Sequence, residues 1–403
     1  MRRQAVQGGR MDEFNAVARG AIAEDENWER ALQEVLEQVC DITADVAFLF
    51  ASEVYAEHFS EIARRVRRET GVPVLVGCSG QSIIGSAQEL EGMPALSLLT
   101  LTLPGASLQA IRFTQEKVED CAFPRAWHEH LGITPDEVNA WLIFADPFQM
   151  DVERLIDGLA EAYPSRPMLG GLASGDTAER RTFVFLNDDV FDEGGVGLAI
   201  GGAYTILPLV SQGCEPIGEP WTITKVRGNL IETISNRPAY DLLIETLYDL
   251  PTEMQRRARY NLLVGLAANE YRDSFPRGSF LIRPLVGVER ANRGLAIGAF
   301  PRVGQTIQFQ LRDAAAADRD LIELLEEART SLGENKPVAG VLCSCNGRGI
   351  GMFGTHDHDA SAVAQQLGQL PLAGLFCNGE IGPIGARPYL HGFTASLALV
   401  VRN

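Results

Sequence analysis

Two short apolar runs near the C-terminus break abruptly into small and polar residues, and this pattern constrains the fold strongly. Residues 340–344 lead into the segment C-N-G-R (345–348), and residues 372–377 lead into N-G-E (378–380). Short apolar runs of this kind are typical of buried strands. In α/β proteins ligands bind at the carboxyl ends of such strands. The sequence therefore predicts an α/β fold with a binding edge at these two strand ends.

Size and composition place the chain among globular proteins of more than one domain. The chain has 403 residues, 46% of them hydrophobic and 22% charged, so two domains are expected. The formal net charge of −18 argues against nucleic acids and anionic membrane surfaces as partners. Seven scattered cysteines indicate reduced thiols. With neither a secretory signal nor a bilayer-spanning run expected, we predict a cytoplasmic protein without membrane insertion.

The order of apolar segments favours mixed α/β sheets in two domains. Val46–Phe50, a helical stripe from Tyr55 to Val66, and Val72–Val76 form a strand–helix–strand unit that ends in a Gly-rich turn. The texture changes at 213–220, where Gly and Pro recur every few residues. The predicted division is an N-terminal tail (1–26), a first domain (27–225) and a second domain (226–403).

A weak self-similarity accompanies these strand ends. The segments 75–80 (L-V-G-C-S-G), 169–175 (L-G-G-L-A-S-G) and 375–379 (L-F-C-N-G) share one plan, in which an apolar strand gives way to small residues, a polar residue and Gly. Two halves that each present such edges could face one another across a cleft. We therefore expect the ligand cleft at or near the interface of the two domains.

Two motifs near the C-terminus invite specific chemistry. Residues 349–354 match G-x-G-x-x-G, but 355–359 separate the motif from the next helix and no acidic residue stands about twenty positions on, so a plain Gly-rich loop is favoured over a dinucleotide site. Cys343 and Cys345 with the histidines of H-D-H (356–358) hold enough N and S ligands for zinc. Their spacing matches no known zinc motif, and the alternative is two buried thiols beside a polar loop.

A nucleophilic thiol and a haem are two further alternatives. Cys345 lies close in sequence to Arg348, which could lower its pKa, and His391 or His356 could serve as base in a thiol-dependent transferase or hydrolase. Any of the six histidines could bind haem iron. Because no C-x-x-C-H motif is present, such a haem would be held non-covalently.

The chain from about residue 40 to residue 403 resembles the FIST family of sensory modules. The resemblance is carried in the C-terminal half by 300–307 (F-P-R-V-G-Q-T-I), 345–348 (C-N-G-R), 374–383 (G-L-F-C-N-G-E-I-G-P), His391 and Thr394. In the N-terminal half it is carried by 76–80 (V-G-C-S-G) and 170–175 (G-G-L-A-S-G).

The resemblance implies an N-terminal and a C-terminal FIST domain that bind a small ligand, with amino acids suggested for the family. Relatives are fused to histidine kinases, chemotaxis receptors or other output modules. This chain would then be a stand-alone sensory protein that signals through contact with a partner such as a histidine kinase. Some relatives are regarded as haem-based nitric oxide sensors, which keeps haem as the alternative cofactor.

The leading hypothesis is a binder of an amino acid or a similar zwitterion or anion, and we do not expect an enzyme. Arg348 would grip a carboxylate or phosphate, Glu380 would receive an amine, and polar strand-end residues would orient the ligand. The alternative for Arg348 and Glu380 is a mutual structural salt bridge. The predicted ligand-binding residues are Ser79, Gly80, Gly171, Ser174, Cys345, Asn346, Arg348, Asn378, Gly379 and Glu380.

Overall fold

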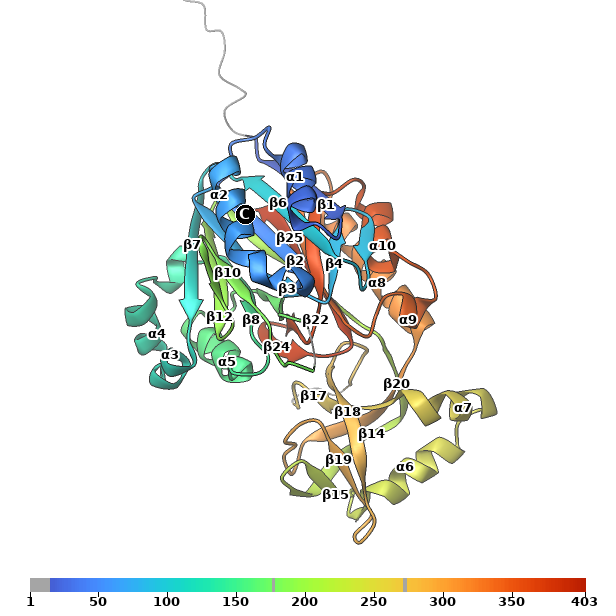
Figure 1. Ribbon diagram of the computed structural model, residues 1–403. Coiled ribbons are helices and arrows are strands. Elements are labelled where there is room, and N and C mark those ends of the chain that lie inside the picture. The colour runs from blue at the N-terminus through green and yellow to red at the C-terminus, as the bar shows by residue number, and fades with distance from the viewer. Residues whose placement is uncertain (1–14, 176–177, 271–273) are drawn as a thin grey trace, which may run out of the picture.

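The computed structural model describes residues 15–175, 178–270 and 274–403 (Figure 1). In these ranges the chain forms four β-sheets, and the three that make up the main body share one strand topology. The three sheets of the main body are mixed, the fourth is antiparallel, and helices pack against them, so the predicted α/β class with mixed sheets is confirmed.

Three consecutive parts of the chain, which we call units 1, 2 and 3, each build one of these sheets. In every unit the four main strands lie in the order first, last, second, third, and only the second and third strands are parallel. The main strands are β1 (Val17–Glu24), β2 (Val46–Ser52), β3 (Val74–Gly80) and β6 (Ala95–Thr102) in unit 1; β7 (Ala106–Phe113), β8 (Ala140–Ala145), β9 (Met168–Leu172) and β12 (Gly195–Gly202) in unit 2; and β13 (Tyr204–Gln212), β21 (Ala339–Cys345), β22 (Leu372–Cys377) and β25 (Thr394–Arg402) in unit 3.

Helices cover the outer face of each sheet. In α1, Asn27 accepts N–H bonds from the first turn as an N-cap, and the apolar stripe behind it packs on the sheet of unit 1. The helices are α1 (Trp28–Val39), η1 (Glu53–His58) and α2 (Phe59–Thr70) in unit 1; α3 (Gln115–Asp120), α4 (Pro124–Leu131), η2 (Pro135–Glu137) and α5 (Val152–Ala162) in unit 2; and α8 (Ala314–Leu332), α9 (Ile350–Phe353) and α10 (His358–Leu367) in unit 3.

Each unit lends a hairpin to the sheet of another unit. In every case the hairpin follows the third strand in the chain and pairs with the third strand of a different unit. Unit 1 gives β4 (Ser82–Gly85) and β5 (Gln88–Leu90) to unit 3, unit 2 gives β10 (Val184–Leu186) and β11 (Asp189–Phe191) to unit 1, and unit 3 gives β23 (Glu380–Ile384) and β24 (Arg387–His391) to unit 2. The exchange is cyclic, so the three units depend on one another.

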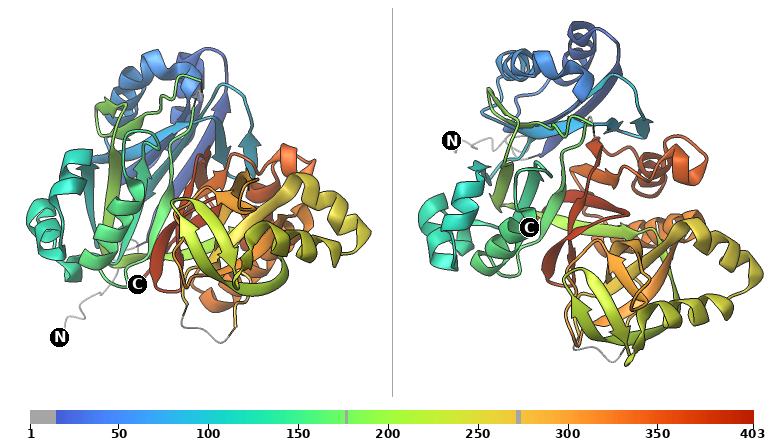
Figure 2. Two further views of the ribbon diagram at one scale, coloured as in Figure 1. Left: turned by 90° about the horizontal axis from the view of Figure 1, so that it is seen from below. Right: turned by 60° about the horizontal axis from the view of Figure 1, so that its bottom comes forward.

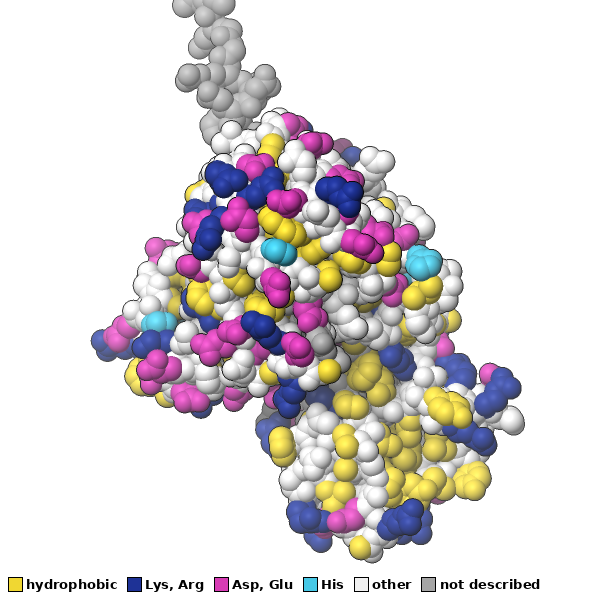
Figure 3. Space-filling model, in the orientation of Figure 1, with side chains coloured by type: hydrophobic (Ala, Val, Ile, Leu, Met, Phe, Trp, Pro, Cys, Tyr) yellow, Lys and Arg dark blue, Asp and Glu magenta, His cyan; other side chains and the backbone are white. Residues whose placement is uncertain are grey.

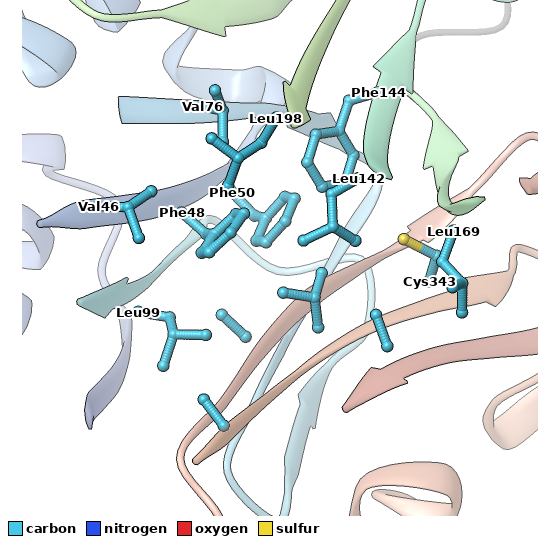
Figure 4. Close-up of a cluster of buried hydrophobic side chains, with 14 of the residues drawn as sticks. Val46, Phe48, Phe50, Val76, Leu99, Leu142, Phe144, Leu169, Leu198 and Cys343 are labelled. Carbon is cyan, nitrogen blue, oxygen red and sulfur yellow. The ribbon is translucent and has the colours of Figure 1, made fainter. Parts of the chain in front are cut away.

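The inner faces of the three sheets share one apolar core. Alternate residues of each second strand point into it, for example Phe48 and Phe50 from β2, Leu142 and Phe144 from β8, and Cys343 from β21 (Figure 4). The Phe50 and Phe144 rings meet edge to face with centroids 5.2 Å apart. All five side chains are essentially inaccessible to solvent. The core therefore belongs to no single unit.

A glycine stands at the same register position in the third strand of every unit. Gly77, Gly170 and Gly374 lie opposite Leu49, Ile143 and Leu342 of the parallel second strands. A Cβ atom added at any of the three would lie 1.8–1.9 Å from the carbonyl oxygen of that opposite residue. These glycines differ from the one that closes each predicted self-similar segment (Gly80, Gly175 and Gly379), and the repeat is threefold where the sequence indicated two halves.

A fourth sheet is inserted into unit 3 between β13 and α8, and we call residues 214–312 the insert. In Figures 1 and 2 it forms a separate lobe below the three-unit body. Two helices pack on one face of its sheet and enclose a second core. Its elements are β14 (Cys214–Arg227), β15 (Leu230–Ile234), β16 (Arg237–Pro238), α6 (Ala239–Tyr248), α7 (Thr252–Asn261), β17 (Leu262–Ala267), β18 (Phe280–Glu289), β19 (Gly294–Ile297) and β20 (Thr306–Arg312).

The predicted N-terminal tail contains a strand, and the predicted domain boundary falls within another strand. Residues 17–24 fall in the predicted tail, yet they form β1, which pairs antiparallel with β6; the strand is rich in Ala and Gly and gives a weak apolar signal. The predicted boundary at 225/226 falls within β14. Across the described ranges no helix is long and apolar enough to cross a membrane.

The three equivalent glycines should be sensitive to a single added methyl group. Gly77→Ala, Gly170→Ala or Gly374→Ala should each lower the free energy of unfolding by about 3 kcal/mol or more, because backbone must move apart in a parallel pair. Urea unfolding followed by circular dichroism measures the effect. Gly351→Ala is the matched control, since its added Cβ meets nothing within 4 Å. Equal stability of Gly374→Ala and Gly351→Ala would contradict the close approach.

Candidate functional site

The predicted residues at the three strand ends come together, but mainly as partners of one another. The Ser79 hydroxyl donates to the Ser174 carbonyl at 2.9 Å, and the Ser174 hydroxyl donates to the Phe376 carbonyl at 2.5 Å. The Asn346 amide donates to the Asn378 side-chain oxygen at 2.8 Å. These bonds tie the ends of β3, β9 and β22 together across the three units.

Most of the strand-end set is closed off from solvent. Ser79, Ser174 and Glu380 are fully buried, Arg348 is 2% exposed, and Asn378 is exposed. The glycines at 80, 171 and 379 are buried as well, and Cys345 and Asn346 are half-buried. None of the ten residues lines the three hollows of the groove described below, and Gly80 lines a separate hollow of about 340 Å³ at the end of β3.

Arg348 binds a carboxylate of the protein itself. Its Nε and Nη2 atoms donate to the two oxygens of Asp359 on α10 at 2.7 and 2.8 Å, with both side chains at or below 1% exposure. The Ser344 hydroxyl also donates to Asp359 at 2.6 Å. Burial works against ionisation, yet the Arg348 guanidinium holds the pKa of Asp359 well below its usual range. The bidentate ion pair fills the fork that sequence analysis offered to a ligand.

The sequence contained a signal for this partner. Asp359 precedes Val363 by four positions, so in a helix the two share a face, and Val363 packs in the apolar core of unit 3. An acid on the buried face of a helix needs a cation. The alternative of a salt bridge between Arg348 and Glu380 is wrong, because Arg348 pairs with Asp359 and the Glu380 carboxylate accepts from Thr394 and Cys377. The Arg348 Nη1 atom is buried without a hydrogen-bond partner among the described residues.

Two residues close in space hydrogen-bond to the carboxylate of Glu380, and its side chain is buried. Thr394 donates its backbone N–H and its hydroxyl to Oε2 at 3.1 and 2.7 Å, and the Cys377 thiol donates to Oε1 at 3.3 Å. Burial raises the pKa of Glu380 to about 7, in spite of these donors. At neutral pH the Glu380 carboxyl group is therefore present in both its protonated and its ionised form.

Cys345 and the histidines lie in environments that restrain their chemistry. Burial raises the pKa of Cys345 to about 12, with Glu380 adding to the rise, so little thiolate forms at neutral pH. His358 bonds Asp359 and Asp318 through its two ring nitrogens, and His391 donates from Nε2 to the Gly382 carbonyl. Within the described part of the chain no cluster of three or more His, Cys, Asp and Glu side chains could hold a metal.

A groove runs between the insert and unit 2, away from the predicted strand ends. It consists of three adjoining hollows of about 420, 510 and 440 Å³, which we call the polar, apolar and rim hollows. These volumes suit small ligands. Arg302 of the insert lines all three, and Arg283 of β18 and Glu153 of α5 line the first two.

Arg283 is a poorly satisfied cation at the floor of the groove. Its side chain is 13% exposed, and its nearest carboxylate oxygen, on Glu153, lies 3.4 Å from Nη2. Its other hydrogen bonds go to the carbonyl groups of Ile282 and Leu390. Burial lowers the pKa of Arg283. A buried guanidinium with one long ion pair is suited to receive an added anion.

The wall opposite the insert carries acids and an aromatic ring. Glu153 and Asp157 lie one turn apart on α5, and their side chains are 65% and 54% exposed. Arg387 of β24 pairs with Asp157 at 2.8 Å and lies over the Tyr389 ring. The Tyr389 hydroxyl donates to the Ala268 carbonyl at 3.1 Å, which joins the sheet of unit 2, through the hairpin lent by unit 3, to the insert beside the polar hollow.

The insert differs in charge from the rest of the chain. Residues 214–312 contain 13 Lys and Arg against 10 Asp and Glu, in a chain whose formal net charge is −18. On the face of the insert seen in Figure 3, dark blue side chains outnumber magenta ones. The groove therefore lies where a basic lobe meets an acidic body, and both signs of charge line it.

These features define a three-unit α/β body with an inserted lobe. Comparison with known proteins shows to which family the chain belongs. The FIST N domain model matches residues 45–237 and the FIST C domain model matches residues 239–383. The chain belongs to the FIST family, and the suspected resemblance is confirmed. The two models meet at residue 238, within the insert.

Relatives in mycobacteria cover nearly the whole chain. A protein of Mycobacterium tuberculosis H37Rv described as uncharacterized is 35% identical over 369 residues, which are 91% of this chain and 93% of that protein. One of Mycobacterium bovis, also described as uncharacterized, is 34% identical over 356 residues, 88% of this chain and 90% of the relative. A crystal structure of cyanuric acid hydrolase from A. caulinodans aligns over 96% of this chain and 99% of that chain at 10% identity, with a TM-score of 0.36 that carries no inference.

The groove was not predicted from the sequence, although one of its residues lies in a segment that was singled out there. Arg302 lies in the segment F-P-R-V-G-Q that carried the family resemblance, yet it was not assigned to the site. Glu153, Asp157 and Arg283 come from elements that are distant in sequence, and nothing local marks them as neighbours. Only the packing of the insert against unit 2 brings them together.

The buried ion pair predicts a pattern of mutant stabilities. Arg348→Met should lower the free energy of unfolding by about 3–5 kcal/mol, because it leaves the Asp359 charge buried without its cation. Arg348→Met with Asp359→Asn should recover much of that loss, since no charge remains buried. Arg19→Met, in the exposed pair with Asp41, is the control and should cost about 1 kcal/mol or less. Equal losses in the single and double variants, measured by urea unfolding, would contradict a structural pair.

Glu380 predicts a pH dependence of stability. Its folded pKa of about 7 lies above the ordinary glutamate pKa of about 4.5, so its contribution to stability is present below about pH 4.5 and is lost as the pH rises through 7. Burial also raises the pKa of Glu89 to about 8, which acts in the same direction. Glu380→Gln should therefore lose less stability than the wild type between about pH 5.5 and about pH 8.5. Urea unfolding of the variant and the wild type at both pH values tests this. An equal loss of stability in the two proteins would contradict the prediction.

Proposed function

We propose that this protein is a sensory protein that binds a small zwitterion, such as an amino acid, in the groove between the insert and unit 2. The single observation that carries the proposal is the opposition of charges across the polar hollow. Arg283 and Arg302 lie on the insert side, while Glu153 and Asp157 lie on α5. A ligand carboxylate would bind the guanidinium groups, and its ammonium group would bind the acids.

The state of Arg283 gives further support. Because its guanidinium is largely buried and has only one distant carboxylate partner, an added carboxylate would supply hydrogen bonds that the protein leaves weak. The excess of basic residues in the insert would draw an anionic group toward the same place.

The proposal moves the ligand site away from the strand ends. Ser79, Ser174, Arg348 and Glu380 are engaged with protein groups, so their proposed role is to join the three units. We propose that the signal passes to a protein partner, such as a histidine kinase, in the cytoplasm. The presence of seven cysteines without a disulfide among them fits that compartment.

Binding to the purified full-length chain tests the proposal. Isothermal titration with a panel of single amino acids should show at least one that binds, and Arg302→Ala should weaken it about tenfold or more through loss of a charge-assisted hydrogen bond. Arg290→Ala, an exposed arginine of the same lobe that lines none of the hollows, should leave the affinity unchanged.

Two results would contradict the proposal. One is equal loss of affinity in Arg302→Ala and Arg290→Ala, which would mean that only the overall charge of the insert matters. The other is a Soret band in the ultraviolet–visible spectrum of natively purified protein together with an absence of amino acid binding. That result would favour the haem-based alternative.

A further inference from the structure

The polar hollow opens directly into a second hollow of different chemistry. The two share lining residues from both sides of the groove, so a single ligand can occupy both. The shared residues are Glu153, Leu281, Arg283, Phe300 and Arg302. The charged groups among them all lie at the shared end, and beyond them the apolar hollow contains no further charged residue.

The apolar hollow is lined mainly by hydrocarbon. Its apolar residues come from β17, β18, β19 and the segment that follows β19: Leu266, Leu281, Val286, Ile297, Ala299 and Phe300. Two of them are unusually exposed, with Val286 at 65% and Phe300 at 84% of their full accessible surface. Covering these side chains with an apolar group would release free energy in proportion to the area removed from water.

We infer that the ligand is an amphipathic carboxylate whose charged head occupies the polar hollow and whose linear apolar tail lies in the apolar hollow. This inference rests on the proposed function and names its ligand class. The head is the zwitterionic group, whose carboxylate would bind Arg283 and Arg302 and whose ammonium group would bind Glu153 and Asp157 along the rim of the polar hollow. The tail is long enough to pass Leu281 and reach Val286 on β18, both of which line the apolar hollow.

The polarity of the groove favours this class over other small ligands. A small polar amino acid would satisfy the charges but leave Val286 and Phe300 in water. A sugar or nucleotide would place hydroxyl groups against a hydrocarbon wall, where they would lose hydrogen bonds to water. A fatty acid has the tail and the carboxylate but nothing to engage Glu153 and Asp157.

A homologous series of ligands tests the inference. Calorimetric titration of the full-length protein with 2-aminoalkanoic acids, from alanine to 2-aminodecanoic acid, should show affinity rising about fourfold per methylene until the apolar hollow is filled. Octanoate should bind more weakly than 2-aminooctanoic acid, because it lacks the ammonium group. Tail selectivity is then read from the slope, and head selectivity from the octanoate comparison.

A pair of variants on one strand supplies the matched control. Val286→Glu places a charge in the apolar hollow and should abolish the rise in affinity with chain length while leaving the affinity for alanine unchanged. Val288→Glu, two residues along β18 and 42% exposed, lines none of the three hollows and should keep the full slope. Both sites are exposed, so thermal unfolding should be little changed in either variant.

The outcomes separate the inference from the proposed function. Binding of alanine with no dependence on chain length would overturn the inference and leave the proposed function standing. An intact slope in Val286→Glu would overturn it as well, because the tail would then lie elsewhere. No binding by any member of the series would overturn both. Equal affinities of octanoate and 2-aminooctanoic acid would support the tail but overturn the zwitterionic head.

Discussion

The common core of the three units is the constraint on which the rest of the structure depends. Each sheet has one apolar face under its own helices and a second apolar face that only the other two sheets can cover. Exposing such a face to water would cost a large part of the stability of a unit. The cyclic exchange of hairpins adds main-chain hydrogen bonds to the same association, so a single unit lacks both its inner cover and an edge strand.

This constraint decides what the strand ends can do. In an open α/β sheet the carboxyl ends of the parallel strands face a crevice, and ligands bind there. Here the third strands of three sheets meet, and the polar groups at their ends bind one another, as Ser79 and Ser174 do. Buried charges nearby are likewise neutralised by protein groups, as Arg348 is by Asp359. The rule for single sheets therefore pointed to a joint between units, and the hollows lie where the insert meets unit 2.

Single helices and strands could be predicted from the sequence, but the contacts between the units and with the insert could not. Apolar runs predicted β2, α2 and β3, because these depend on local periodicity. The equivalent glycines Gly77, Gly170 and Gly374 were not identified as a set, because their cause, a carbonyl oxygen on a neighbouring strand, is a long-range contact. Asp359 could have been identified from helical spacing alone. The groove could not, because Glu153 and Arg283 are 130 residues apart in the chain and meet only through the packing of two lobes.

The position of the groove also explains why binding there would suit a sensor. The insert is joined to the body by polar contacts at two sides: Tyr389 to the Ala268 carbonyl beside the groove, and Arg312 to the Gly347 carbonyl beside the strand ends. A ligand in the polar hollow would touch β18 on the insert and α5 on unit 2 at once. Its binding free energy would then depend on the distance between the two lobes, and any partner that reads that distance would read occupancy. A ligand held inside the shared core would have no such effect, because the three sheets cannot move apart without exposing their inner faces.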